Sequence, residues 1–371
     1  MRTHWTRHDL KWPVAALLVS AALFLGGCAS SPASSGAGTG ASLKDATVLS
    51  NPKSHQGPST AHLAASEISP VAKNPEQKLP VTVTDAQGTK VTISDISRIL
   101  PIDLYGTSSR IVFDLGLGKN VVGRDVSSVF PEIAQLPLVT HNGHELNAEA
   151  ILELAPTLII TDSSLGPWDV VLQMREAGIP VFVVDSHRSI ETAPEMITQI
   201  AGALGVPEEG KKLADRTNSE ISAMQDAIAK IAPKGNDRLR MVFLYARGQS
   251  GVYNLFGEGS GADSLITGLG GIDVATEIGW KGMRPMTDEA LVEAKPDLVI
   301  MMSGGLESTG GIDGIFDSVP ALAFTQAGEN KRIVDMADSD VLSFGPNSAA
   351  ILEALAVAVY APDSSTSAAK Q

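Results

Sequence analysis

Two short motifs carry side chains that could bind a transition metal. The first is His141-x-x-His144, and the second is Tyr245-x-Arg247 at the end of an apolar run. Residues i and i+2 of an extended chain face the same side, so the Arg247 guanidinium can lie beside the Tyr245 hydroxyl. A nearby positive charge favours the phenolate and lowers the tyrosine pKa, which makes the side chain a better donor to Fe(III).

The histidine pair also admits other chemistry. Because Glu145 follows it directly, His144 could form the acid–base pair of a secreted hydrolase, or the pair could bind zinc. A structural zinc site needs further ligands, and outside the N-terminal segment only His187 or carboxylates remain. No Gly-x-Ser-x-Gly, Walker or His-Glu-x-x-His motif occurs. We therefore expect a binding protein and not an enzyme, with the hydrolase as an alternative.

Composition narrows the class of protein. The 371 residues contain 28 Lys and Arg against 42 Asp and Glu, a net charge of -14. This balance argues against a nucleic-acid-binding protein, which needs a basic face, so we expect no nucleic-acid partner. The single cysteine, Cys28, excludes a disulfide framework, a cysteine zinc site and an iron–sulfur cluster.

The N-terminus predicts export. Residues 13–25 form an uncharged apolar run, too short for an ordinary membrane span, behind a basic start. The run ends in LGGC (25–28), which resembles a bacterial lipobox, and the only cysteine stands where the lipid would be attached. We expect residues 1–27 to be a lipoprotein signal peptide. Cys28 would then anchor an extracytoplasmic protein to the outer face of the cytoplasmic membrane.

Two further segments are expected to lack packed structure. Residues 28–78 contain no Phe, Trp or Tyr and are dominated by Ser, Ala, Pro and Gly. Such a segment buries too little apolar surface to offset its ordering entropy, so we expect a flexible tether. Residues 361–371 are expected to form a disordered tail.

The remaining chain predicts two α/β lobes. After a β-hairpin at 81–93, continuous apolar runs alternate with helical segments, as in parallel sheets covered on both faces. We expect an N-terminal lobe over 79–206 and a C-terminal lobe over 233–360. A helical pattern over 207–231, within the interlobe segment 207–232, would join them, although one long surface helix is also compatible. The runs expected as strands are 98–102, 120–123, 157–161, 180–185, 239–245, 297–302 and 332–334, with a second hairpin around 251–256.

A repeated unit links the lobes. NAEAILELAPTLIIT (147–161) and TDEALVEAKPDLVIM (287–301) align without gaps and share six of 15 residues. Each copy predicts an N-cap at Asn147 or Thr287, a short helix, a proline stop and a buried strand. Such a pseudo-twofold chain favours a ligand site in a cleft between the lobes.

These features resemble a known family. The lipobox, the tether, two lobes joined by one helix and the repeated Glu…Pro-x-Leu-x-Ile unit resemble the class III (cluster A) substrate-binding proteins of metal-chelate ABC importers. The segments VTHNGHELNAEAILELAPTLIITD (139–162) and FLYARG…GVYNLFGEGSGADSLI (243–266) resemble the haem-binding lipoproteins of the HmuT group. The resemblance implies a haem receptor that delivers ferric haem to an ABC permease dimer and its ATPase. Ferric-siderophore and cobalamin binders share the scaffold and remain alternatives.

The resemblance also implies roles for residues. A Gly-His-x-Leu histidine and a Tyr-x-Arg tyrosine are the axial haem ligands of the group, and these positions match His144 and Tyr245. Arg247 matches the arginine that supports the tyrosine. Because the His-x-x-His pair offers two donors, His141 is the second choice.

Three further expectations concern charged residues and assembly. At the repeat offset, His144 corresponds to Arg284, so Arg284 and Lys281 are candidates for the haem propionates, or equally solvated loop charges. The resemblance implies that Glu149 and Glu289, one per lobe, dock on arginines of the permease. Without the permease, we expect a monomer.

Overall fold

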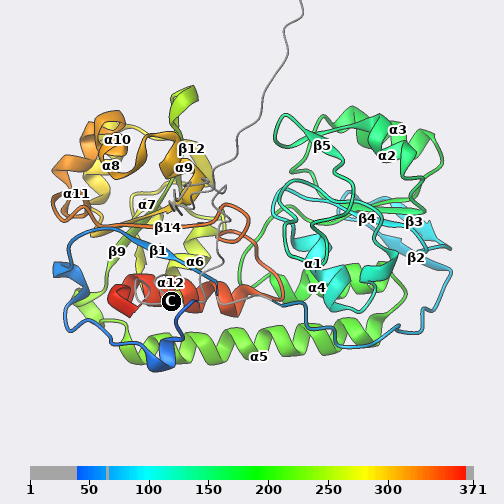
Figure 1. Cartoon of the computed structure of the whole chain (residues 1–371), viewed down its shortest axis with the longest axis horizontal. Coiled ribbons are helices and arrows are strands. Elements are labelled where there is room, and N and C mark those ends of the chain that lie inside the picture. The colour runs from blue at the N-terminus through cyan, green and yellow to red at the C-terminus, as the bar shows by residue number, and fades with distance from the viewer. Residues whose placement is uncertain (1–39, 64–66, 365–371) are drawn as a thin grey trace, which may run out of the picture. The chain divides into compact units, whose positions relative to one another are not determined.

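The computed structural model describes residues 40–63 and 67–364, which belong to one compact unit (Figure 1). The predicted signal peptide, 1–27, and Cys28 lie outside the described residues. Within the described ranges, no helix combines the length and apolar character needed to span a bilayer.

The first half is built on a three-stranded parallel sheet in the order β4-β7-β8. Every residue of these strands is buried, which explains their continuous apolar runs. Side chains of α1 and α4 pack on one face, and those of α2 and α3 pack on the other. The bounds are β4 (Ile99–Pro101), β7 (Leu158–Thr161), β8 (Val181–Val183), α1 (Thr107–Asp114), α2 (Ala148–Glu153), α3 (Trp168–Glu176) and α4 (Ala193–Ala203).

The hairpin that precedes this sheet is present, and one expected strand is not. β2 (Val81–Thr84) and β3 (Lys90–Ile93) pair antiparallel, as the sequence predicts. The run 120–123 forms no strand, and Val121 makes only an isolated bridge to Ile99. A 3₁₀ turn over Gly118–Asn120 ends directly before Val121, so too little of the run is extended to pair.

The second half contains a larger mixed sheet in the order β1-β14-β13-β9-β10-β12, with β11 also paired to β9. β1, β14, β13 and β9 run parallel to one another, whereas β10 is antiparallel to both of its neighbours, β9 and β12. The strands are β1 (Ser59–Ala61), β9 (Arg240–Arg247), β10 (Val252–Phe256), β11 (Ile272–Asp273), β12 (Met283–Pro285), β13 (Leu298–Met302) and β14 (Ile333–Met336). The helices of this half are α6 (Ala262–Gly268), α7 (Val274–Glu277), α8 (Asp288–Ala294), α9 (Ser303–Ser308), α10 (Gly311–Ser318), α11 (Gln326–Glu329) and α12 (Ser348–Tyr360).

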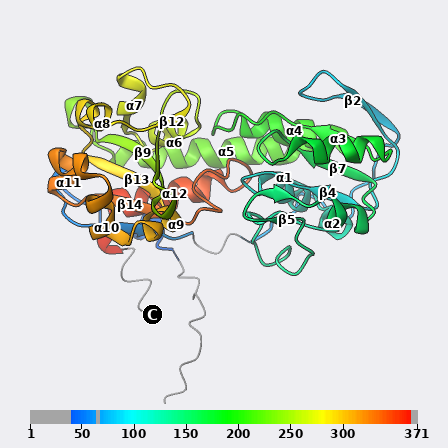
Figure 2. The ribbon, with the colours of Figure 1, turned by 90° about the horizontal axis from the view of Figure 1, so that it is seen from above.

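One long helix, α5 (Pro207–Ile231), packs on both halves. Its early residue Leu213 belongs to the core of the first half, whereas Ile221 and Ile228 belong to the core of the second. Figures 1 and 2 show α5 passing α4 and then α12, in agreement with its contacts to both helices. The predicted class of two α/β lobes joined by a single long helix is therefore confirmed.

The repeated sequence unit is also a structural repeat. The side chains of Asn147 and Thr287 cap α2 and α8 by accepting the backbone N–H three residues further on. Ala155 and Lys295, which occupy equivalent positions after the two helices, both adopt positive φ, 42° and 47°. Each unit then enters a central parallel strand, β7 or β13.

The described part of the expected tether is folded. β1 pairs with β14, and Leu43 and Ala61 are buried. The segment contains no aromatic residue, and hydrogen bonds hold it in place. Ser59 Oγ donates to the Ala358 carbonyl at 2.7 Å, and Thr60 Oγ1 donates to Asp335 Oδ1 at 2.9 Å. The structure therefore differs from the expectation of a flexible tether in this part of the chain. The segment has few apolar residues, but it pairs with the edge strand β14 and forms hydrogen bonds with polar groups there.

The beginning of the expected tail is packed as well. Ala361 is fully buried, and the backbone N–H of Thr47 donates to Ser364 Oγ at 3.2 Å. Contacts with residues near the start of the described chain therefore order the tail as far as residue 364, and residues 365–371 lie outside the description.

Candidate functional site

A tight β-hairpin presents the two candidate histidines. β5 (Thr140–His141) and β6 (Glu145–Leu146) pair antiparallel, with His141 opposite Glu145. The turn between them uses Asn142 and Gly143 at φ values of 45° and 89°, a conformation that this residue pair adopts readily. His144 comes directly after these two residues. The hairpin therefore places His141 in its first strand and His144 in its turn.

The surroundings of the two histidines differ. His141 Nε2 lies 3.4 Å from Glu145 Oε2, which also accepts a hydrogen bond from Asn142 Nδ2 at 3.2 Å. Charges of the second half act on His144 instead. Its pKa is lowered by partial desolvation and by the positive charge of Arg247, and Asp338 offsets part of this shift. His144 is therefore held as a neutral imidazole, the form that donates to a metal.

Tyr245 lies at the end of β9, where the cross-strand pairing with β10 continues. Its half-buried ring stacks on Phe256 with a centroid separation of 6.2 Å. The Arg247 guanidinium lies 4.6 Å from the centroid of the Tyr245 ring. The two side chains lie together, as the i, i+2 spacing predicts, but the guanidinium lies over the ring face, whereas the prediction placed it beside the hydroxyl.

Arg247 has partners that the sequence motif does not reveal. Its Nη2 donates to Asp338 Oδ2 at 3.0 Å, and its Nη1 donates to the Ala246 carbonyl at 2.9 Å. Asp338 lies 91 positions further along the chain, in the segment after β14, and sequence spacing contains no signal for this contact. Tyr245, Arg247 and Asp338 therefore form one cluster in the second half, and the charges of Arg247 and Asp338 act on His144 of the first half.

The two candidate propionate-binding cations have local partners. Lys281 Nζ lies 3.0 Å from Glu258 Oε2, and both side chains are well exposed. The Arg284 guanidinium lies 4.8 Å from the ring centroid of Trp280. Trp280 is anchored by its indole N–H, which donates to the Leu255 carbonyl at 3.1 Å. Both cations keep donor groups directed to solvent.

The alternative metal and hydrolase chemistries find little support in the geometry. Glu145 contacts His141 and not His144. His187 is bound by its own neighbour, with Nδ1 2.7 Å from Asp185 Oδ1, and both side chains are exposed. In the ranges that the structure describes, no group of three or more His, Cys, Asp or Glu side chains could hold a metal ion.

The candidate docking residues occupy equivalent places. Glu149 and Glu289 lie in the first turns of α2 and α8, and both side chains are exposed. Among the described residues, neither forms an ion pair. Their positions favour the helix dipole, and their exposure leaves the carboxylates free to meet a partner.

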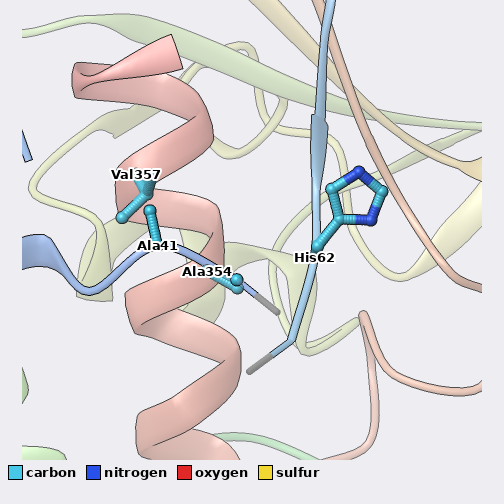
Figure 3. Close-up of a pocket in the computed structure, with 5 residues that line it drawn as sticks. Ala41, His62, Ala354 and Val357 are labelled. Atoms are coloured by element: carbon cyan, nitrogen blue, oxygen red, sulfur yellow. The ribbon is translucent and has the colours of Figure 1, made fainter. Parts of the chain in front are cut away.

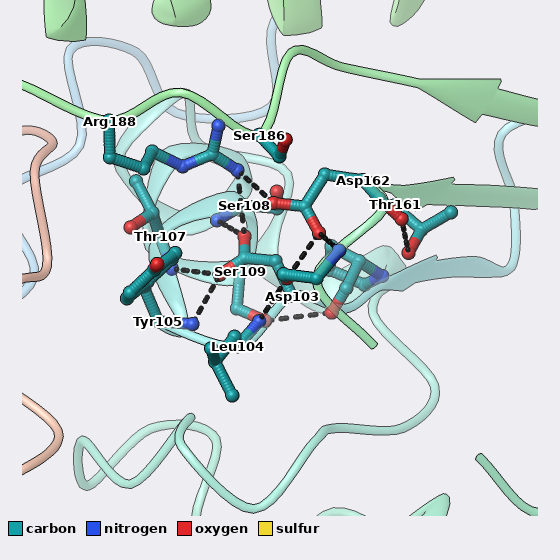
Figure 4. A network of polar contacts seen from close by, with 12 residues as sticks. Asp103, Leu104, Tyr105, Thr107, Ser108, Ser109, Thr161, Asp162, Ser186 and Arg188 are labelled. Carbon is teal, nitrogen blue, oxygen red and sulfur yellow. Dashed lines mark hydrogen bonds and ion pairs between the residues drawn. The ribbon is translucent and has the colours of Figure 1, made fainter. Parts of the chain in front are cut away.

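A buried polar network underlies the first half, and sequence inspection missed it (Figure 4). The Asp103 carboxylate accepts N–H bonds from Tyr105, Thr107 and Ser108, at the start of α1. Arg188 Nη2 lies 2.6 Å from Asp162 Oδ2 and 3.9 Å from Asp103 Oδ2. Burial, together with the charge of Asp103, raises the pKa of Asp162 to about 6.

The network lies next to contacts between the halves. The backbone N–H of Ile190, two residues after Arg188, donates to Ser264 Oγ on α6 at 2.9 Å. The Arg188 guanidinium lies 5.9 Å from the Tyr105 ring centroid, and Tyr105 packs against the core of the second half. Buried charge pairing therefore fixes the segment through which the first half contacts the second.

A small pocket elsewhere offers no competing site. Gly40, Ala41 and His62 meet Ala354 and Val357 of α12 there (Figure 3). Only His62 among these residues has a polar side chain. A single imidazole among small apolar groups does not form a metal or substrate site.

Comparison with known proteins now identifies the family. Residues 102–339, more than half of the chain, match the periplasmic binding protein family. The chain belongs to this family of periplasmic binding proteins. The matched region contains His144 and the cluster of Tyr245, Arg247 and Asp338.

Solved structures include similar periplasmic binding proteins. The crystal structure of the heme-binding protein HmuT shares 43% identity with a TM-score of 0.79, covering 84% of this chain and 99% of HmuT. HmuT has also been crystallised with alanine in place of a histidine, of a tyrosine, and of an arginine two positions after that tyrosine. RhuT from Roseiflexus sp. RS-1, a periplasmic heme-binding protein in apo form, shares 34% identity with a TM-score of 0.64, covering 72% and 99% of the two chains.

A curated relative adds a cellular context. YvrC of Bacillus subtilis (strain 168), an uncharacterised ABC transporter substrate-binding lipoprotein, is 26% identical over 304 residues, 79% of this chain and 89% of YvrC. The relatives described are all named as binding proteins, and YvrC is also named as a lipoprotein.

Proposed function

We propose that this periplasmic binding protein is the haem receptor of an ABC importer and hands ferric haem to a permease and its ATPase. The observation that carries the proposal is the placement of the Arg247 guanidinium over the Tyr245 ring, with the charge of Arg247 also acting on the His144 imidazole of the other half. The 43% identity to HmuT supports it, as does the Tyr-x-Arg spacing that the HmuT alanine variants share with Tyr245 and Arg247.

Each residue has a proposed role. His144 and Tyr245 are the two axial ligands of the haem iron, with His141 as the second choice for the histidine. The lowered pKa of His144 keeps its imidazole neutral and ready to donate. Arg247 is proposed to support Tyr245, since its guanidinium lies 4.6 Å from the centroid of the Tyr245 ring. Arg284 and Lys281 are proposed to meet the propionates, since both cations are exposed and could exchange their present neighbours for a carboxylate.

The proposal includes location and assembly. The protein is not an enzyme, and it acts as a monomer outside the cytoplasmic membrane, anchored through Cys28. The signal peptide ends at residue 27, residues 79–206 and 233–360 form most of the two lobes, 207–232 joins them, and the described residues before 64 and after 360 complete the second lobe. Glu149 and Glu289 contact the permease. The membership of the family and the lipoprotein YvrC support this location.

Hemin titration tests the function. The purified protein, lacking only the signal peptide, is expected to bind one hemin and to develop an absorption spectrum with a phenolate-to-iron charge-transfer band. A ferric siderophore and cobalamin serve as competitors and are expected to leave the bound hemin in place. Displacement of hemin by either competitor, or the absence of a hemin spectrum, would contradict the proposal.

A further inference from the structure

Arg247 is held in place by a carboxylate on a distant segment. Its Nη2 donates to Asp338 Oδ2 at 3.0 Å, while Nη1 donates to the Ala246 carbonyl at 2.9 Å. The face of the guanidinium lies 4.6 Å from the Tyr245 ring centroid. The planar group is therefore restrained by a carboxylate, a carbonyl and an aromatic face.

The carboxylate itself is fixed by the backbone at the end of β13. The N–H of Gly304 donates to Asp338 Oδ1 at 2.8 Å. A Cβ atom on Gly304 would lie 3.0 Å from Asp338 Oδ2, and one on Gly305 would lie 3.4 Å from Arg247 Nη1. The two glycines thus let the backbone approach the ion pair closely. Both side chains of the pair are about one third exposed, so the hydrogen bonds and the close backbone, and not burial, restrain it.

We propose that Asp338 is a positioning residue of the binding site, which holds the Arg247 guanidinium over the Tyr245 ring before the ligand arrives. This inference rests on the proposed function, since the ligand is taken to be ferric haem. A guanidinium that is already placed loses less side-chain entropy when the complex forms. Asp338 therefore strengthens binding through Arg247 and makes no contact with the iron.

A double-mutant cycle in hemin binding tests the inference. Asp338→Ala is expected to weaken hemin binding by roughly threefold to tenfold, the scale of one charge-assisted contact that is no longer preorganised. Asp338→Glu, which restores a carboxylate, is expected to recover part of this loss. In the Arg247→Ala background the same Asp338→Ala change is expected to alter affinity by less than about twofold, because no guanidinium remains to be positioned. The charge-transfer band should shift in Asp338→Ala and not in the double variant relative to Arg247→Ala.

A matched control is available in the same half. Asp313 forms an ion pair with Lys331 at the same 3.0 Å distance, and its side chain is 90% exposed. Asp313→Ala is expected to leave hemin affinity and spectrum unchanged. An equal loss from Asp338→Ala in the presence and in the absence of Arg247 would overturn the positioning role.

A ligand-free measurement separates this inference from the function. In nuclear magnetic resonance spectra of the protein without hemin, Asp338→Ala is expected to shift the Arg247 Nε–H and Tyr245 ring signals. If the wild-type protein fails to bind hemin while these signals shift, the haem function is wrong and the positioning contact stands. Unchanged signals in Asp338→Ala would overturn the inference whatever the ligand.

Discussion

His141 and His144 are three residues apart, yet their surroundings assign them different chemistry. Glu145 pairs with His141 across the hairpin, whereas the charges of Arg247 and Asp338 of the other half act on His144. A histidine within reach of the charges of both halves is better placed to bind a ligand between them. The sequence alone left both donors open, because the hairpin register that separates them is a property of the fold.

Alanine substitutions of the two histidines test this difference. His144→Ala is expected to shift the spectrum of bound hemin and to weaken binding about tenfold or more, because one strong axial donor is lost. His141→Ala should leave the spectrum nearly intact, since it removes only the contact with Glu145. Absorption spectra of the two hemin complexes make the comparison. If His141→Ala alone abolishes the native spectrum, His141 is the ligand.

Arg188 is the residue on which the buried network depends. It is 5% exposed and balances the carboxylates of Asp162 and Asp103. Arg188→Met is expected to destabilise the protein by about 3–5 kcal/mol, the usual effect of leaving a buried charge unpaired. Urea unfolding measures this loss. Lys211→Met is a milder control, because both side chains of the Lys211–Asp215 pair are exposed, and a loss there as large as that of Arg188→Met would contradict the assignment.

The Arg188→Met effect should depend on pH in a defined direction. Burial raises the folded-state pKa of Asp162 from 3.8 to about 6, so the folded protein binds this proton more tightly than the unfolded chain. The contribution of Asp162 to stability is then largest at low pH and falls as pH rises from about 4 to about 6. Loss of Arg188 raises the Asp162 pKa further and extends this window upward. The variant should therefore be less impaired at pH 5 than at pH 8, and an opposite trend would exclude the buried carboxylate as the cause.

At the scale of elements, one arginine closes each repeat helix. Arg98 Nε donates to the carbonyls of Leu154 and Ala155 at the end of α2, both at 3.0 Å. Arg240 does the same for α8, with Nη2 donating to the Ala294 carbonyl at 2.9 Å and Nε to the Lys295 carbonyl at 3.2 Å. The two arginines stand at the beginning of β4 and of β9, so each strand start stabilises the helix end beside it.

Removal of either cap should weaken its helix. Arg98→Ala and Arg240→Ala are each expected to lower the free energy of unfolding by about 1 kcal/mol, the net value of a few exposed hydrogen bonds to helix carbonyls. Hydrogen exchange should accelerate in α2 for the first variant and in α8 for the second. Arg284→Ala, which removes an arginine stacked on an aromatic ring, serves as the control. Equal exchange rates in wild type and variants would show that the carbonyl contacts do not stabilise the helices.

The elements that the sequence predicts well share one property: their signal is local. The buried strands β7 and β13 appear as continuous apolar runs, and α5 appears as a 3.6-residue pattern after Pro207. β1 could not be predicted, because its three residues STA pair with β14 more than 270 positions away and bury little apolar surface. The contact of Asp338 with Arg247 could not be predicted for the same reason, because the two residues are 91 positions apart. Asn142-Gly143, in contrast, is a local signal from which the hairpin could have been predicted.

At the scale of the whole molecule, the two repeat units place equivalent side chains on the two halves. The helix cap, the positive-φ residue and the buried strand recur at matching positions, and so do Glu149 and Glu289. Stability explains the caps and strands in both halves, because each unit must close its own helix. An exposed glutamate in the first turn also favours the helix dipole by roughly 0.3–1 kcal/mol, which accounts for its presence without a partner. An experiment must therefore decide whether Glu149 and Glu289 contact a partner or only stabilise their helices.

Charge reversal separates the two explanations. A permease assembled from two equivalent subunits would offer the same positive contact twice, and this chain presents one exposed carboxylate on each half. Glu149→Lys combined with Glu289→Lys is expected to leave hemin affinity and spectrum unchanged and to abolish haem uptake, because like charges would meet at the contact. Glu195→Lys with Glu208→Lys makes the same change in charge at first-turn glutamates of α4 and α5, outside the repeat units, and should transport normally. Normal uptake by the Glu149 and Glu289 double variant would leave the helix dipole as the reason for both residues.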